Sequence, residues 1–307
     1  MIQRICAIIL FSCLYGLATA QQMPNNTLFD WNKINFNPAF SGTSNTTDII
    51  IQTRQQWIGF ENAPRSQYIL ANAMLEEGIG VGGLIFNNVA GPTKQTGFKA
   101  AFSKHMHLNR NLSFALAISI DMYQNFYDKE RLKTGLPDDP AITYSTLEQK
   151  IAPDASFGTI LYTTNYYIGF STTNITESRY DFFSTTNDFS NPYKRMYHLN
   201  GGYTQVLDKE TKISSSFLLK KTIGLPYQID VSARFYYDFL ITGLSYNLNN
   251  DVSVIAGAQF AKFYEIVYAY DYSFGEMGNY SQGNHEIVLR FKLENKNNRA
   301  KYMNEWF

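Results

Sequence analysis

The sequence predicts an all-β fold, an antiparallel transmembrane β-barrel of about 14 strands with short periplasmic turns and longer extracellular loops. Three observations lead to this prediction. Apolar and polar residues alternate along many short runs, the connections between the runs alternate in length, and the chain begins with a secretory leader.

Alternation is clearest in the run 111–123. Leu116, Ile118 and Ile120 fall on one face of an extended strand, and Ser119 and Asp121 fall on the other. A soluble sandwich would place the polar face in water. A membrane barrel would place the apolar face in lipid and the polar face in its lumen. Alternation alone leaves both possibilities open.

The connections favour the membrane barrel. The predicted strands are 48–57, 65–76, 78–87, 96–104, 111–123, 155–163, 166–172, 195–207, 212–220, 228–237, 239–248, 252–260, 263–273 and 285–293. Connections after even-numbered strands are tight, and those after odd-numbered strands are mostly long, as in 88–95, 124–154 and 173–194; the exception is 249–251. Short turns on one rim and long loops on the other are typical of outer-membrane barrels.

Composition fits a strand-rich chain. Of its 307 residues, 16% are aromatic and 17% are charged, with 22 Tyr and 23 Phe. Outside the leader, no window approaches the roughly 20 apolar residues that a spanning helix needs. The formal net charge is +0 and there is no basic stripe, so the sequence gives no sign of nucleic-acid binding.

Residues 1–20 are predicted to be a signal peptide that is cleaved near Ala20, with a retained anchor helix as the alternative. Cys13 raises the possibility of a lipoprotein, but the residues before it make a poor lipobox. Both cysteines lie in the leader, so the mature chain forms no disulfide. Residues 21–47 are predicted to be an irregular segment, 48–293 the barrel and 294–307 a periplasmic tail.

No catalytic constellation stands out. His105 and His107 would lie on one side of a strand as a possible metal pair, but solvated surface histidines are the favoured interpretation. His198 lies near serines, yet no G-x-S-x-G elbow accompanies it. Asp138 and Asp139 lack the spaced ligands of a calcium loop. We therefore expect no enzyme, no metal, no cofactor and no small-molecule substrate.

Residues expected to face the lumen carry both signs of charge. A selective pore usually has one dominant sign at its constriction, so the mixture fits a lumen that is cross-linked by ion pairs or filled by a plug at least as well. These residues are Arg54, Asp121, Asp230, Arg234, Glu265, Asp271, Glu286, Arg290 and Lys292.

Two stretches carry a family signature. Residues 37–42, Asn-Pro-Ala-Phe-Ser-Gly, are similar to an N-P-A-Y-A-G motif, and residues 54–67 are similar to R-x-Q-W-x-G-x-x-G-A-P-x-T-Q. Together with 78–82, 166–171 and 283–287, they resemble the PorP/SprF family of Bacteroidota outer-membrane proteins. The motif residues, which are also candidate partner contacts, are Asn37, Pro38, Gly42, Arg54, Gln56, Trp57, Gly59, Phe60, Ala63 and Pro64. Asn62 replaces an expected glycine, but Asn also tolerates a left-handed backbone.

The resemblance implies an integral outer-membrane barrel of type IX secretion and gliding motility. Its expected partners are outer-membrane lipid and either an exported cargo protein, such as an adhesin, or the periplasmic secretion machinery. The alternative function is a diffusion channel, or porin, for small solutes.

The loop 57–64 is rich in apolar residues, and Glu61 is its only charged residue. Exposed apolar surface of this kind suggests contact with a partner. The alternative is that the loop folds inward and caps the lumen.

Overall fold

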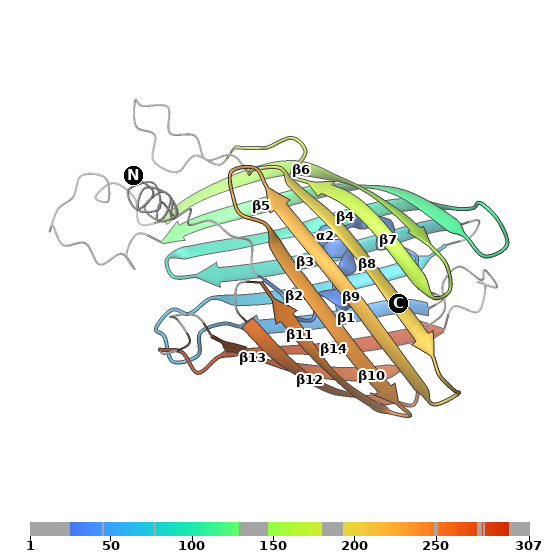
Figure 1. Cartoon of the computed structure of the whole chain (residues 1–307). Helices are drawn as coiled ribbons and strands as arrows, with labels where there is room; N and C mark the ends of the chain where they lie inside the picture. Colours follow the sequence, from blue (N-terminus) through green and yellow to red (C-terminus); the bar gives the residue numbers. More distant parts are fainter. Residues whose placement is uncertain are drawn as a thin grey trace, which may run out of the picture.

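The computed structural model describes residues 25–44, 46–75, 78–128, 147–179, 193–248, 251–274, 278 and 280–294. They form a closed antiparallel barrel of strands β1–β14, in which β1 pairs with β14 (Figure 1). The predicted fold class is therefore confirmed. The predicted signal peptide, Cys13, the pair Asp138 and Asp139, and the tail beyond Glu294 lie outside the described residues.

The strands follow the chain in order around the barrel. They are β1 (Thr46–Gln55), β2 (Arg65–Met74), β3 (Ile79–Ala90), β4 (Thr93–His107), β5 (Ser113–Asp128), β6 (Leu147–Tyr162), β7 (Tyr166–Thr173), β8 (Met196–Val206), β9 (Thr211–Thr222), β10 (Gln228–Tyr237), β11 (Leu240–Asn247), β12 (Asp251–Phe260), β13 (Tyr264–Ser273) and β14 (Asn284–Glu294).

The alternation along each strand separates an outer face from a lumen face. On β5, Ile118 and Ile120 are 61% and 64% exposed on the outside, whereas Ser119 and Asp121 are buried on the inside. The same division holds on β10, where Val231 and Phe235 are exposed and Asp230 and Arg234 are buried. The predicted facing of both strands is confirmed.

Connections after even-numbered strands form one end of the barrel, which we call the turn rim. Those after odd-numbered strands form the other end, the loop rim. β1 begins and β14 ends on the turn rim, where Thr46 pairs with Glu294. One predicted long loop, 88–95, is wrong: only Gly91 and Pro92 separate β3 from β4, because Gly91 adopts a φ of +56° and allows a tight turn.

A second boundary was wrong by eight residues. β6 was expected from 155 but begins at Leu147, and it pairs with β5 along its whole length. Pro153 interrupts the strand signal in the sequence. In a sheet, proline is tolerated where its missing N–H does not face a paired neighbour, so the strand continues through it.

The polarity of the outward-facing residues indicates where the membrane ends on the loop-rim side of the barrel. One lateral row of paired residues is apolar and consists of Ile51, Ile69, Ile85, Phe98 and Met122. The next row toward the loop rim is polar and consists of Thr53, Gln67, Asn87, Thr96 and Gln124. Because hydrocarbon disfavours such a polar row, we place the membrane boundary between the two rows.

Exposed aromatic residues gather toward both rims, as in other membrane barrels. Toward the turn rim they include Tyr166, Tyr203, Tyr237, Phe260, Phe263 and Tyr264, and toward the loop rim Tyr227, Tyr246, Tyr272 and Phe274. Within the described ranges, no helix is long and apolar enough to cross a membrane.

The membrane boundary makes a testable prediction on a single face of β5. Ile120→Arg should destabilise the barrel by about 2–4 kcal/mol, because it places a charge in the hydrocarbon. Gln124→Arg, on the same face but in the polar row, should cost about 0–1 kcal/mol. Urea titration of folding into lipid vesicles measures both variants, and equal costs would contradict the assigned boundary.

Candidate functional site: a filled lumen and the rim above it

The N-terminal segment Asn25–Ser44, which we call the plug, lies inside the barrel. It contains the 3-10 helix η1 (Phe29–Trp31), the short helix α2 (Lys33–Phe36) and the 3-10 helix η2 (Pro38–Phe40). Figure 1 shows this blue segment, with α2, enclosed by the strands. From sequence, this segment is predicted only to precede the sheet. It lacks a regular apolar pattern, so its position inside the barrel could not be predicted.

Aromatic side chains form the apolar part of the plug. The rings of Phe29 and Phe36 are 6.4 Å apart, and those of Phe36 and Phe40 are 6.3 Å apart. Phe40 then meets Tyr167 of β7 edge to face at 5.2 Å. All four rings are buried, so the plug packs against the barrel wall.

At the end near the loop rim, the plug is held by buried charges. Arg54 of β1 is 1% exposed and forms ion pairs with Asp271 at 2.6 Å and Glu286 at 2.7 Å. Glu286 also accepts the backbone N–H of Thr27 at 2.8 Å and that of Leu28 at 3.2 Å. The predicted lumen position of Arg54 is confirmed, and its role is to join the wall to the plug.

A second charged group holds the middle of the plug. Asp30 forms an ion pair with Arg234 at 3.1 Å and accepts a hydrogen bond from Ser216 at 2.5 Å. Lys33 lies 3.6 Å from Asp30 and 4.7 Å from the ring centroid of Tyr167. Burial lowers the pKa of Lys33 to about 8, although the neighbouring Asp30 acts in the opposite direction.

The signature 37–42 forms the end of the plug nearer the turn rim. The Asn37 side chain accepts the N–H of Ala39 at 3.0 Å and donates to the carbonyl of Thr159 at 3.2 Å. Gly158 and Gly169 lie against Asn37 so closely that a Cβ at either position would clash with it. Pro38 occupies the first turn of η2, where proline is favoured.

Gly42 and the glycine run 78–82 fit together. Gly42 has a φ of +75° and donates its N–H to Asn72 at 2.5 Å. A Cβ on Gly80 would lie 2.1 Å from the carbonyl oxygen of Ser41, and one on Gly42 would lie 2.5 Å from the Cα of Gly80. Glycine at both positions is therefore required by the close approach of the plug to β3.

The histidines serve structural contacts. The expectation that His105 is a solvated surface residue is wrong: it is 3% exposed and contacts the Ser41 carbonyl oxygen at 2.8 Å and the Tyr162 hydroxyl at 2.8 Å. His107 is exposed and contacts Ser113. His198 is buried against the ring of Phe36. Among the described residues, no group of three or more potential ligands is placed to hold a metal ion.

A residue from the β7–β8 connection closes part of the lumen beyond the plug. The hydroxyl of Tyr193 donates to Asn125 at 2.6 Å and accepts from Gln95 at 2.7 Å. Its ring centroid lies 4.7 Å from that of Tyr123, and both rings are buried. This contact could not be predicted from sequence, because Tyr193 lies in an irregular stretch.

The signature loop between β1 and β2, residues 56–64, runs along the loop rim. Trp57 has a φ of 48° and donates its N–H to Asn284 at 2.9 Å. Ile58 exchanges backbone hydrogen bonds with Gly283 and Gln282, and Gly91 donates to the Asn62 carbonyl. The loop is thus fixed between the β13–β14 connection and the β3–β4 turn.

The same loop exposes apolar surface. Phe60 is 39% exposed, and Gly59, Glu61 and Asn62 are exposed too. The other loop residues are partly buried: Gln56, Trp57, Ile58, Ala63 and Pro64. Asn62 has a φ of 59°, so the left-handed backbone expected at this position is confirmed. The plug lies in the lumen below the loop, and capping by the loop stays a prediction beside partner contact.

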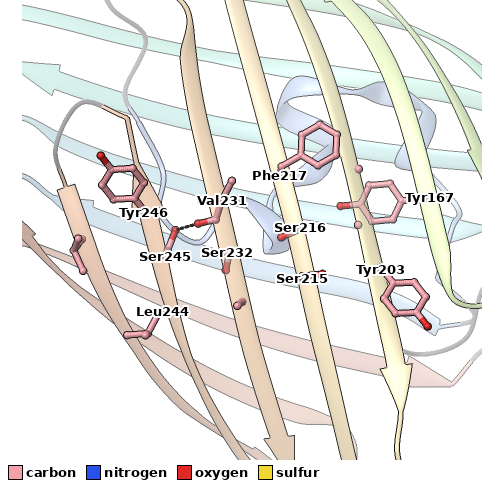
Figure 2. Close-up of a pocket in the computed structure, with 14 residues that line it drawn as sticks. Tyr167, Tyr203, Ser215, Ser216, Phe217, Val231, Ser232, Leu244, Ser245 and Tyr246 are labelled. Atoms are coloured by element: carbon pink, nitrogen blue, oxygen red, sulfur yellow. Dashed lines mark hydrogen bonds between the residues drawn. The ribbon is translucent and has the colours of Figure 1, made fainter.

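A shallow apolar groove of about 710 Å³ lies in the wall across β7–β12 (Figure 2). Tyr203, Phe217, Leu244 and Tyr246 line it from the outer face. The wall is thin at Gly201 and Gly202, where Phe217 covers the first glycine and Tyr167 covers the second. This groove opens toward lipid, so it is a feature of the membrane-facing wall.

These features define an outer-membrane barrel whose lumen is filled by its own N-terminal segment. The sequence model of the type IX secretion system membrane protein PorP/SprF matches residues 18–291. The chain therefore belongs to the PorP/SprF family, as the signature predicted. No curated protein matches the sequence significantly.

Solved structures with a similar fold are outer-membrane barrels. A Pseudomonas aeruginosa FadL homologue has a TM-score of 0.47 at 10% identity, covering 91% of this chain and 96% of that one. The Pseudomonas putida toluene transporter TodX has a TM-score of 0.48 at 10% identity, covering 84% and 92%. The KdgM porin has a TM-score of 0.41 at 10% identity, covering 80% and 98%. These likenesses are distant and concern the fold alone.

The contact between Gly80 and Ser41 allows the plug to be tested. Gly80→Val should displace the plug and give conductance in a planar bilayer, because its side chain would occupy the position of the Ser41 carbonyl. Gly83→Val is the matched control, since a Cβ there meets nothing within 4 Å. Steady conductance of the unaltered protein would contradict a closing plug.

The ion pairs of Arg54 make a prediction about stability. Arg54→Met should destabilise the barrel by about 3–5 kcal/mol, because it leaves Asp271 and Glu286 buried without their cation. Arg65→Met, at an exposed position of β2, should cost less than about 1 kcal/mol. Denaturant titration in vesicles compares the two; a small, equal loss for both would show that the buried pairs do not anchor the fold.

Proposed function

We propose that this protein is a non-enzymatic docking barrel of type IX secretion. In this proposal it holds exported surface proteins at the outer face of the outer membrane and connects to the periplasmic secretion machinery. The supporting observation is the filled lumen, in which residues 25–44 pack against the wall and pair with its charges. Such an interior favours a binding role over the passage of solutes.

The loop rim provides the working surface in this proposal. The 56–64 loop presents Phe60 to solvent while its backbone is fixed by hydrogen bonds to two neighbouring connections. A rigid apolar loop loses little conformational entropy on binding, so it is suited to a partner. Aromatic anchors of this kind commonly dominate the energetics of protein interfaces.

The proposal includes no catalytic step. His105 and His198, which the sequence singled out, are engaged in buried packing and hydrogen bonding. The alternative function, a diffusion channel for small solutes, requires an open lumen. Single-channel recording separates the two, because a docking barrel should be nearly silent and a channel should conduct steadily.

Phe60 gives the direct test of docking. Phe60→Ala should reduce the amount of exported protein displayed on intact cells, while the amount and heat-modifiability of the barrel stay unchanged. Phe263→Ala is the matched control, because Phe263 is also about 40% exposed but lies at the turn rim. Surface labelling with antibodies against type IX cargo measures display.

Two results would overturn the proposal. If display is unchanged in Phe60→Ala, the loop is not the docking surface. If display falls equally in both variants, the effect comes from general destabilisation of the barrel.

A further inference from the structure

The β5–β6 hairpin rises beyond its neighbour on one side. β6 pairs with β5 from Tyr162 to Leu147, but it pairs with β7 only from Phe157 to Tyr162. Among the described residues, the last backbone hydrogen bond beyond this ladder runs from the Ile175 N–H to the Ala155 carbonyl at 3.0 Å. Asn174, with a φ of 57°, then turns the chain after β7 away from β6.

Strand geometry identifies which backbone N–H and C=O groups of β6 face the β7 side. Successive residues direct their N–H and C=O alternately to the two sides of a strand. Since the Ala155 carbonyl faces the β7 side, Pro153, Ile151 and Gln149 face that side too. Pro153 has no N–H, and its carbonyl accepts the Thr176 and Ser178 hydroxyls. In the part of the chain that the structure describes, no backbone hydrogen bond reaches Ile151 or Gln149 from this side.

This edge lies outside the hydrocarbon. Ile151 pairs with Gln124, a member of the polar row, and Gln149 lies one row further toward the loop rim. Ile151 is 59% exposed, and Gln149 and Lys150 are also exposed. Unpaired backbone groups are not tolerated in lipid but are accessible to a partner in water.

We propose that the edge Gln149–Ile151 accepts an extended segment of an exported protein as an added β-strand. This inference rests on the docking function proposed above and names its mode of recognition. Addition of a strand to an open edge obtains affinity from backbone hydrogen bonds and specificity from alternating side chains. The added strand would lie where a longer β7 would have continued.

The neighbouring side chains define the chemistry of the segment. Ile151 lies on the outer face, so an apolar residue of the segment fits beside it. Lys150 lies on the opposite face of β6 and is exposed, so an acidic residue of the segment fits there. Pro153 limits the added strand to a short length, because pairing cannot continue past a residue without an N–H.

A proline substitution tests the edge. Ile151→Pro removes the N–H that faces the partner and leaves the hydrogen bonds to β5 intact, as Pro153 already does. Display of exported protein on intact cells should fall by about fivefold to tenfold, which corresponds to a lost backbone hydrogen bond. Ile151→Val keeps the N–H and should display cargo at the unaltered level. Equal display in both variants would overturn the proposal.

Cross-linking tests the edge without depending on proline. A benzophenone amino acid is placed at Gln149, Ile151 or, as a lipid-facing control, Ile118. The proposal expects positions 149 and 151 to link to the same short stretch of one exported protein, with attachment points about two residues apart. Links that are scattered over several proteins, or that match those of the Ile118 control, would overturn it.

Failure of this proposal is distinguishable from failure of the docking function. If Phe60→Ala abolishes display while Ile151→Pro does not, docking stands and strand addition is wrong. If neither variant changes display, both proposals are wrong.

Discussion

The buried ion pairs of the barrel wall, and the hydrogen bonds that the plug makes to them, are the interactions on which the rest of the structure depends. Arg54, Asp271 and Glu286 are almost fully buried, and the backbone N–H groups of Thr27 and Leu28 complete their hydrogen bonding. Removing one partner from such a group leaves an uncompensated charge. The plug thus completes the hydrogen bonding of these wall charges, and Asn25 makes a second contact of this kind with the Lys220–Asp230 pair.

Buried ion pairs contribute more to uniqueness than to net stability, since desolvation offsets most of their attraction. Here the contacts are spaced along the plug, with Glu286 at Thr27, Arg234 at Asp30, and Gly80 and Gly82 at Ser41 and Gly42. A shift of the plug by one residue would mismatch all three contacts. The spacing thus selects one register for a segment that has little regular structure of its own.

Much of the barrel was predictable from sequence because a membrane wall imposes a strict period of two. Leu116 to Asp121 could be assigned to faces from alternation alone. The start of β6 could not be predicted because proline normally ends a strand. Pro153 is tolerated because its nitrogen, which carries no hydrogen, faces the side of β6 that has no paired strand there. The tight β3–β4 turn was missed because the predicted strand ended at 87, whereas pairing with β2 and β4 extends it to Ala90.

The plug was harder to predict, because its position depends on contacts far apart in sequence. The mixed charge of Arg54, Asp271 and Glu286 indicated a paired or plugged lumen but not which segment fills it. The signature residues are explained once the contacts are known. Close packing between plug and wall accounts for Asn37, Gly42, Gly80 and Gly169. The hydrogen-bonded loop on the rim accounts for Trp57 to Pro64.

The rim and the plug are physically joined through β14. Asn284 accepts the N–H of Trp57 and donates to Asp271, and Asp271 pairs with Arg54, which in turn donates to Thr27 of the plug. By linkage, any coupling free energy carried by this chain of contacts acts equally in both directions between the loop and the plug. In the docking function proposed above, a partner on the rim and a plug in the lumen are therefore compatible parts of one arrangement.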